Sequence, residues 1–396
     1  MGLIKTEEYG YCYGSETILP GYRDMEDTGF YIADTGVLYV SQSKKLKNIY
    51  PLVYDCDNLV KAQYNAQKGK GDRAEINDFN DNINERLADL YVSLHDMTYV
   101  PGKYKIKDII DKKKRTIMIA PFYPDRIVHH SVINVLGPRW IHVFVSHTYA
   151  CIKGRGIHKC MEDIHHALIT DRKGTEFCFK MDITKYFDNV DHAALKAIIR
   201  RVIADQQMLW LLDAIIDSNG KDKGLPIGNF TSQYLANLYL AYFDHWVLEE
   251  LNRTVRDKFG VRIYYYRYMD DIVVLCASKE ALHYVLDMMG LYLASELKLE
   301  IKSNWQIFPV DDRGIDYVGF RQNHYGILLR KSILTRFYSK FRKISKKYHV
   351  KDIDDIKHLF PSEYGWILRC SEEHSNFIFN NCLQHGKECI EYRAAG

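Results

Sequence analysis

The sequence feature that most constrains the fold is a pair of adjacent carboxylates, Asp270 and Asp271, between two apolar runs with β-strand character. Residues 263–266 (Ile-Tyr-Tyr-Tyr) precede the pair and residues 272–275 (Ile-Val-Val-Leu) follow it. Aspartate is a poor strand former and an unpaired buried carboxylate is costly, so packing alone does not explain the pair. The pattern predicts a β-hairpin whose tip begins at Tyr268 and holds a divalent cation that offsets the carboxylate repulsion.

A third carboxylate, Asp182, ends the hydrophobic run 177–181, which also predicts a strand. Taken alone, Asp182 is more simply a helix N-cap or turn residue. If its strand neighbours the hairpin in one antiparallel sheet, however, Asp182 converges with Asp270 and Asp271 at one edge. Three carboxylates with open coordination positions suit two Mg²⁺ ions, which can activate an attacking hydroxyl and stabilise the leaving oxygen of a phosphoryl transfer.

Length and charge narrow the class of protein. A chain of 396 residues predicts two or three subdomains, and 47% hydrophobic with 27% charged residues is ordinary for a globular protein. The formal net charge is only +3, yet residues 330–349 carry eight Lys or Arg and no acid. That run indicates either an anionic partner or a solvated helix face. Nine cysteines without a CxxC pair, no signal peptide and no membrane-length apolar stretch predict a cytoplasmic protein without a membrane partner.

The order of the motifs resembles that of reverse transcriptases over about residues 55–385. Residues 182–188 (Asp-Ile-x-x-Tyr-Phe-Asp) resemble their motif A, and residues 224–240, which begin Gly-Leu-Pro-Ile-Gly-Asn, resemble motif B. Residues 268–271 (Tyr-Met-Asp-Asp) resemble motif C, and residues 314–320 resemble the strand that leads into the primer-grip hairpin.

The form of motif B points to a subgroup. Its Gly-Asn-x-Thr-Ser-Gln segment, residues 228–233, is similar to the enzymes of diversity-generating retroelements, whereas group II intron enzymes more often carry a Gln-Gly and Ser-Pro version. Residues 125–130, 149–156 and 364–366 indicate the same subgroup. Some anti-phage defence reverse transcriptases share these features, so both subgroups stay open.

The resemblance implies an α+β right-hand polymerase fold. Fingers and an antiparallel-sheet palm would interleave over residues 46–328, and a helical basic thumb and C-terminal tail would cover residues 329–396. Residues 1–45 would form an N-terminal extension of unknown role. Within the palm, Thr231 or Ser232 is expected to cap a long helix that runs to about residue 251.

The implied activity is RNA-directed DNA synthesis. A primer 3′-OH would attack the α-phosphate of a dNTP opposite a template RNA, with two Mg²⁺ ions, or Mn²⁺ in their place, as cofactors. Asp182, Ile183, Asp270 and Asp271 would be the metal ligands. Lys302 resembles the motif D lysine that protonates the leaving pyrophosphate, although a surface lysine is an equal alternative.

The nucleotide site follows from the same resemblance. Arg115 and Lys113 match a fingers strand whose cations clamp the triphosphate, and Phe187 matches the steric gate against a ribose 2′-OH. Ile227 stands where retroviral enzymes carry a Gln that contacts the nucleotide sugar, which suggests looser base-pair positioning and error-prone copying. The other expected dNTP contacts are Gly228, Gln233 and Tyr268.

Template and primer contacts are expected on two segments. Lys153 and Arg155 stand beside glycines that permit close backbone approach, and a basic exposed turn is the alternative. Arg330, Lys331 and Lys340 belong to a helix that would grip the backbone of an RNA–cDNA hybrid.

Partners and rival functions are also implied. A structured template RNA is expected, with a small basic accessory protein or a homo-oligomer as further possibilities. An RNA-dependent RNA polymerase is the rival enzyme, and Phe187 argues against it. A non-catalytic nucleic-acid-binding scaffold is the rival from another class, and the three intact carboxylates argue against that.

Overall fold

The computed structural model describes residues 30–32, 38–40, 45–71, 73–111, 113–348 and 350–394. The first two segments, β1 (Phe30–Ile32) and β2 (Leu38–Val40), pair as an antiparallel hairpin. The rest of the predicted N-terminal extension, up to residue 44, lies outside the described residues.

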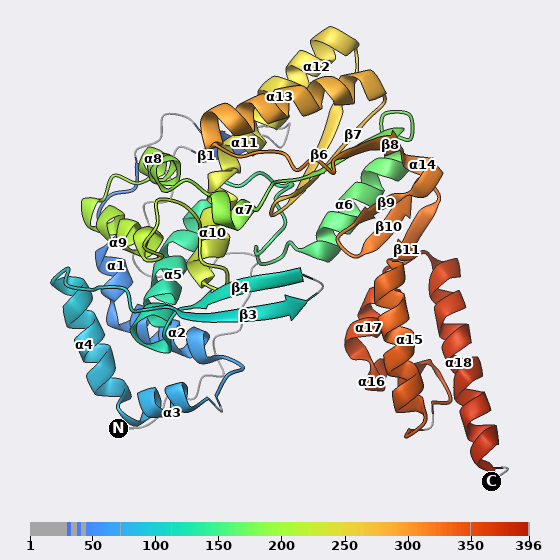
Figure 1. Cartoon of the computed structure of the whole chain (residues 1–396), viewed down its shortest axis with the longest axis horizontal. Helices are drawn as coiled ribbons and strands as arrows, with labels where there is room; N and C mark the ends of the chain where they lie inside the picture. The colour runs from blue at the N-terminus through green and yellow to red at the C-terminus, as the bar shows by residue number, and fades with distance from the viewer. Residues whose placement is uncertain are drawn as a thin grey trace.

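The fingers combine helices with a two-stranded antiparallel ribbon (Figure 1). Their elements are α1 (Pro51–Tyr54), α2 (Cys56–Gln67), α3 (Ala74–Asp81), α4 (Ile83–His95), β3 (Lys105–Asp111), β4 (Lys113–Ile119), the short helical segment η2 (Phe122–Arg126) and α5 (Ile127–Ile141). The β3–β4 ribbon extends away from these helices toward the C-terminal part of the molecule, and Ile106 on it is 68% exposed.

The palm is a four-stranded antiparallel sheet with helices on both faces. Its elements are α6 (Ile157–Thr170), β5 (Phe177–Asp182), α7 (Tyr186–Asn189), α8 (His192–Val202), α9 (Gln206–Asp217), α10 (Phe230–Tyr239), α11 (Ala241–Trp246), η3 (Val247–Leu251), α12 (Asn252–Phe259), β6 (Ile263–Tyr268), β7 (Asp271–Cys276), α13 (Lys279–Leu297) and β8 (Gln306–Pro309). The strand order is β6-β7-β5-β8, which confirms that the hairpin and the Asp182 strand are neighbours.

Alternation along the strands explains why both faces of this sheet are buried. On β7, Val273 and Leu275 join one apolar cluster beneath α6, while Ile272 and Val274 join the main core beneath α13. Successive side chains of a strand point to opposite faces, so a strand covered on both sides needs a continuous apolar run. The run ends at Asp271, where the sheet edge opens.

The C-terminal part begins with a one-turn helix, followed by a second sheet and then by further helices (Figure 1). Its elements are α14 (Val310–Arg313), β9 (Ile315–Tyr317), β10 (Phe320–Asn323), β11 (Gly326–Leu329), α15 (Lys331–Ser345), α16 (Ile353–Leu359), α17 (Pro361–Ile367) and α18 (Glu372–Ala394). The sheet has the order β11-β10-β9, and the helices share an apolar cluster of their own around Phe337, Phe341 and Phe360. These helices therefore pack around a second core, which Met161 of α6 joins to the palm.

The predicted cap of the motif B helix is wrong. Helix α10 begins at Phe230 with Asn229 in the N-cap position, while Thr231 and Ser232 are buried inside its first turn. The Asn229 side chain donates to the Tyr104 hydroxyl at 2.7 Å, so it ties the helix start to the fingers instead of capping it. The helical run also passes residue 251 and ends only at Gly260, whose φ of 68° suits a C-terminal glycine. No helix in the described part is both long and apolar enough to cross a bilayer.

Candidate active site

The Tyr-Met-Asp-Asp segment forms the tip of the β6–β7 hairpin. Tyr268 and Asp271 are the last paired residues, so Met269 and Asp270 make a two-residue turn. Met269 has a φ of 60°, in the left-handed region that residues with a side chain rarely adopt. Such a conformation persists only where the surroundings hold it, and it is typical of functional turns.

The three predicted carboxylates converge at this tip. Asp182 is the direct cross-strand partner of Asp271, which confirms the predicted antiparallel pairing of the two strands. Burial, followed by the nearby charges of Asp182 and Asp271, raises the pKa of Asp270 to about 7. Burial and the Asp182 charge likewise raise the pKa of Asp271, although the cations Lys180, Arg330 and Lys302 oppose the shift. Like charges held this close need a counter-charge.

Lys302 supplies one cation to the cluster. Its Nζ lies 2.9 Å from Asp182 Oδ2, and its backbone N–H donates to the Asp182 carbonyl at 2.9 Å. The hydrogen bond and the charge of Asp182 raise the pKa of Lys302, so the side chain holds its proton firmly. The structure therefore brings the predicted proton donor into contact with the predicted metal ligands.

Ile183 is placed beside the carboxylates with its carbonyl group unused by the neighbouring strand pairing. It faces Ile301 between two hydrogen bonds, Thr184 N–H to the Glu300 carbonyl and Lys302 N–H to the Asp182 carbonyl. In an antiparallel pair, the residue between two such bonds directs its own N–H and C=O to the other side. The Ile183 carbonyl is thus available on the side away from residue 301.

The oxygen ligands of this site fit hard divalent cations, but they do not form a complete coordination shell. Carboxylate and carbonyl oxygens are the ligands that Mg²⁺ and Mn²⁺ prefer. Among the described residues, no group of three or more His, Cys, Asp or Glu side chains is arranged to hold a metal ion by itself. In enzymes that act on nucleotides, substrate phosphates and waters complete the coordination shell of the metal. The crowding of Asp182, Asp270 and Asp271 and the incomplete ligand shell are therefore both consistent with such a metal site.

Phe187 lies on α7, the short helix that follows Asp182 in the chain, and the motif B loop is hydrogen-bonded to its backbone. The Phe187 carbonyl accepts the Leu225 N–H at 2.7 Å, and its ring makes an edge contact with Tyr186. Gly224 has a φ of 92°, and a Cβ there would meet the Asp188 backbone at 3.2 Å. Only glycine suits this close approach of the two motifs.

Motif B also touches the fingers ribbon. A Cβ on Gly228 would meet the Ile117 side chain at 3.1 Å, and Gly228 has a φ of 114°. Ile227 beside it is half-buried. Arg115 and Lys113 lie on the same strand β4, where Arg115 pairs with Ile109, but their side chains lie outside the described part, so their contact with a triphosphate stays a prediction.

A cavity of about 420 Å³ lies between motif B and the fingers. It contains the predicted contacts Gly228 and Gln233, and it adds cations that the sequence did not single out. Its other lining residues are Asn65, Lys70, Arg73, Ile117, Ile119, Arg126, His129, His130, Asn229 and Phe230.

Electrostatics makes this cavity cationic. Burial, followed by nearby cationic groups, lowers the pKa of His129 to about 3 and that of His130 to about 4, so both imidazoles are neutral near pH 7. Lys70, Arg73 and Arg126 then supply the charge. Three cations beside two neutral imidazoles suit an anionic or nucleotide ligand.

The predicted template and primer contacts differ in their surroundings. Lys153 is exposed, whereas Arg155 Nη1 donates to the carbonyls of Val145 at 2.6 Å and Thr148 at 3.0 Å. Arg155 thus holds its own loop. Lys331 is exposed, while Arg330 Nε lies 2.5 Å from Asp316 Oδ1.

Lys340 is also paired, with its Nζ 2.6 Å from Glu363 Oε1. Around it, the exposed cations of this stretch cover the outside of α15 and the turn after it. They are Lys331, Arg336, Lys340, Arg342, Lys343, Lys346 and Lys347.

Two residues near the Tyr268–Asp271 turn, which we call the catalytic turn for its predicted role, were not predicted. The Tyr317 hydroxyl on β9 accepts the Tyr268 N–H at 2.9 Å and donates to the Asp271 carbonyl at 2.6 Å, so it joins the turn to the second sheet. Arg267 is a fully buried cation in the strand before the turn. In the sequence, the only indication of these two residues was a charged or hydroxyl-bearing side chain within a predicted strand.

These features define a right-hand polymerase palm: an antiparallel sheet, carboxylates from two strands at one edge, and a fingers ribbon against the motif B loop. The sequence profile of the family "Reverse transcriptase (RNA-dependent DNA polymerase)" matches residues 105–321. The chain belongs to this family. The predicted polymerase fold and enzyme class are thereby confirmed.

Individual relatives are more distant. The group II intron-encoded protein LtrA of Lactococcus lactis is 26% identical over 195 residues, which cover 46% of this chain and 32% of LtrA. Protein YkfC of Escherichia coli is 25% identical over 234 residues, which cover 51% of this chain and 61% of YkfC. The chain therefore spans less than two thirds of the length of either relative. Among solved structures, apo telomerase from Candida tropicalis is 12% identical with a TM-score of 0.45 over 75% of this chain and 59% of that chain.

Proposed function

We propose that this protein copies RNA into DNA by two-metal nucleotidyl transfer. The observation that carries the proposal is the pairing of Asp182 with Asp271 across β5 and β7, with Asp270 at the adjacent turn. In this family, binding of the catalytic metal ions is the simplest role for three carboxylates at a sheet edge. The division into fingers and palm over residues 46–328 and thumb over residues 329–396 belongs to the same proposal.

Asp182, Asp270, Asp271 and the Ile183 carbonyl would hold two Mg²⁺ ions, or Mn²⁺ in their place. When bound, such ions lower the pKa of an attacking hydroxyl and neutralise charge on the leaving group. Lys302, whose side chain contacts Asp182, would give a proton to the pyrophosphate that leaves.

The substrate is a dNTP, because the Phe187 ring would meet a ribose 2′-OH. Arg115 and Lys113 are proposed to clamp the triphosphate, with Tyr268 as a further contact of the nucleotide. Gly228 and Gln233 would contact the new base pair from the cavity between palm and fingers. A rival RNA polymerase activity would require room for the 2′-OH at Phe187.

The duplex is proposed to lie along the exposed cations of α15. Phosphate contacts supply affinity without sequence choice, as a polymerase that moves along its template requires. A structured template RNA and its RNA–cDNA hybrid are the proposed nucleic acids, Lys153 a template contact, and the cytoplasm the proposed compartment, in keeping with free thiols at the described cysteines.

Primer extension on a defined RNA template tests the proposal. The wild-type protein should extend the primer with dNTPs and not with NTPs, in the presence of Mg²⁺ or Mn²⁺, and Asp270→Asn should abolish extension. Equal extension with NTPs would instead support the RNA polymerase. A scaffold role would be supported if Asp270→Asn kept the biological activity of the wild type.

We further propose that the copying is error-prone and serves a diversity-generating retroelement. The Ile227 side chain cannot donate or accept hydrogen bonds to the nucleotide sugar, and it is half-buried in the loop between Gly224 and Gly228. A small basic accessory protein would add the charge that a net +3 chain lacks.

Ile227→Gln tests the fidelity claim, with the neighbouring Leu225→Ile as a matched control. Misincorporation should fall in the first variant and stay at the wild-type level in the second. Sequencing of the cDNA made in cells separates the subgroups: errors directed to adenine would indicate a diversifier, while uniform or repeated products would indicate phage defence.

A further inference from the structure

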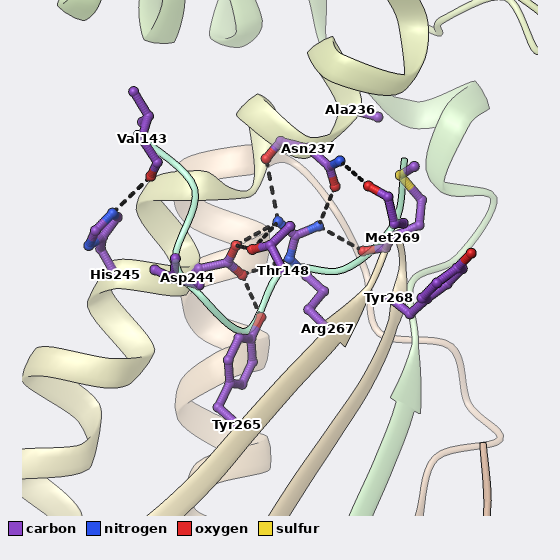
Figure 2. A network of polar contacts seen from close by, with 12 residues as sticks. Val143, Thr148, Ala236, Asn237, Asp244, His245, Tyr265, Arg267, Tyr268 and Met269 are labelled. Carbon is purple, nitrogen blue, oxygen red and sulfur yellow. Dashed lines mark hydrogen bonds and ion pairs between the residues drawn. The ribbon is translucent and has the colours of Figure 1, made fainter. Parts of the chain in front are cut away.

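A buried ion pair lies directly behind the catalytic turn (Figure 2). Arg267 precedes Tyr268 on β6, and neither its side chain nor that of Asp244 on α11 has exposed surface. Arg267 Nε donates to Asp244 Oδ1 at 2.7 Å, and Nη2 donates to Oδ2 at 2.5 Å. A buried guanidinium is costly unless its charge and its N–H groups are all matched.

The remaining N–H groups of Arg267 reach other segments. Nη1 donates to Asn237 Oδ1 at 3.2 Å and to the Met269 carbonyl at 2.9 Å. Nη2 also lies 3.4 Å from both Thr148 Oγ1 and the Asn237 carbonyl. Each of the five donors of the guanidinium thus has an acceptor, and one acceptor is the catalytic turn itself.

The contact to Met269 has a specific consequence for Asp270. The Met269 carbonyl belongs to the planar peptide that joins Met269 to Asp270. A hydrogen bond that fixes this carbonyl therefore fixes the orientation of the whole peptide plane. Because the Asp270 N and Cα atoms lie in that plane, the direction of the Asp270 side chain is restricted as well. It also stabilises Met269 in its left-handed conformation, which would otherwise be strained.

The pair is anchored on more than one side. Asp244 also accepts hydrogen bonds from the Tyr265 hydroxyl at 2.6 Å and from Thr148 Oγ1 at 3.1 Å. The Arg267 backbone exchanges hydrogen bonds with the loop before α6, since its N–H donates to the His147 carbonyl and its carbonyl accepts the Tyr149 N–H. The guanidinium is consequently held by two helices and a loop, and it cannot follow a movement of the turn.

A purely structural role would not require this arrangement. Buried ion pairs are often no more stabilising than apolar residues of similar volume. With no exposed surface, the guanidinium also cannot bind a nucleotide or a phosphate. The contact that apolar packing could not replace is the one to the Met269 carbonyl.

We propose that Arg267, held in place by Asp244, is a positioning residue that orients the Met269–Asp270 peptide and thereby directs the Asp270 carboxylate toward the metal site. The proposal rests on the proposed nucleotidyl-transfer function, and it assigns no contact between Arg267 and substrate.

Two variants and a matched control test it. The double variant Arg267→Met with Asp244→Leu removes both charges and the turn contact while filling the space. Arg267→Lys keeps the charge, but a single ammonium lacks the fork that reaches Asp244 and Met269 together. Tyr265→Phe is the control, because it removes a hydrogen bond to the same carboxylate and leaves Met269 untouched.

Both Arg267 variants should lower kcat about a hundred-fold, the loss typical of a group misplaced by roughly 1 Å, with KM for dNTP nearly unchanged. They should also bind Mn²⁺ several-fold more weakly in the absence of nucleotide, and amides 268–271 should exchange hydrogen faster. Tyr265→Phe should resemble the wild type in all three measurements.

The proposal is overturned if the double variant melts with the wild type and keeps its kcat, Mn²⁺ affinity and exchange rates. If the double variant fails to fold, Arg267→Lys decides by the same criteria. A wild-type protein that extends no primer would defeat the proposed function only, since Mn²⁺ binding and hydrogen exchange at the turn still test the positioning role.

Discussion

Arg267 in the palm and Lys340 in the thumb are both cations paired with carboxylates, but their surroundings are opposite. The Arg267–Asp244 pair is fully buried, whereas the side chains of Lys340 and Glu363 keep 49% and 23% of their exposure. An exposed pair contributes little and is screened by salt, while breaking a buried pair leaves a charge without a partner. The palm therefore uses charge to fix geometry, and the thumb uses it to supply a surface of one sign.

The difference teaches where single substitutions matter. In the palm, Arg267 contacts the Met269 carbonyl and Lys302 contacts Asp182, so one change at either residue should disturb the site. On α15, neighbouring cations share the same task, so the effects of their removal should add gradually. The following predictions would break or sharpen this contrast.

The largest effect is expected at Asp182. Asp182→Asn removes one of the carboxylates proposed to hold the cations and also the partner of Lys302, so kcat should fall about a thousand-fold or more. Steady-state primer extension measures it, with Asp287→Asn, an exposed carboxylate on α13, as the control. Wild-type activity in Asp182→Asn would refute the assignment of the palm site.

A smaller effect is expected at Phe187. Phe187→Ala should raise incorporation of NTPs relative to dNTPs by about a hundred-fold, because rejection of one hydroxyl is a steric contribution of that order. Tyr186→Phe, on the adjacent buried ring, should leave the ratio unchanged. Competition between dNTP and NTP on one template measures the ratio of their incorporation directly. An unchanged ratio in Phe187→Ala would show that Phe187 is not the steric gate.

In the thumb, removal of positive charge should act on affinity alone. Arg336 and Lys343 are seven residues apart on α15 and share one face. Replacing both by Gln should weaken hybrid binding about ten-fold at low salt, and the slope of log affinity against log salt should become shallower by about 0.7–0.9 for each phosphate that is no longer neutralised. Lys279→Gln on α13 is the control, and a fall in kcat at saturating hybrid would contradict the contrast.

The smallest effect concerns stability and pH without divalent cations. The pKa of Asp270 is about 7 in the folded protein against an ordinary 3.8, so the folded state binds this proton more tightly than the unfolded state does. Stability should therefore decrease as pH rises from about 4 to about 7. Melting curves should show this slope, Asp270→Asn should flatten it, and Mg²⁺ should restore stability above pH 7. The account of crowded carboxylates would be contradicted if the stability of the wild type increased with pH over this range and Asp270→Asn abolished that increase.

The sequence was informative where a local pattern determines position. A two-residue turn between apolar strands placed Asp270 and Asp271, and strand alternation with antiparallel pairing brought Asp182 to them. Arg267 and Asp244 lie on different elements and meet only through tertiary packing, so no periodic pattern in the sequence could predict their contact. The cations Lys70 and Arg126 of the cavity were missed for the same reason.

The wrong cap prediction has a local explanation. Thr231 and Ser232 are common cap residues, but Asn229 occupies that position and its amide bonds Tyr104, far away in the sequence. Residue preference cannot anticipate a tertiary partner.

The most direct test of the central claim separates binding from chemistry in one experiment. Single-turnover extension on a preformed RNA–DNA hybrid should show Asp270→Asn with a wild-type hybrid Kd and a rate lower by about a thousand-fold. The Arg336 and Lys343 double variant should show the reverse, a weaker Kd with a wild-type rate once bound. If Asp270→Asn extends the bound primer at the wild-type rate, the carboxylate edge of the palm is not the site of chemistry.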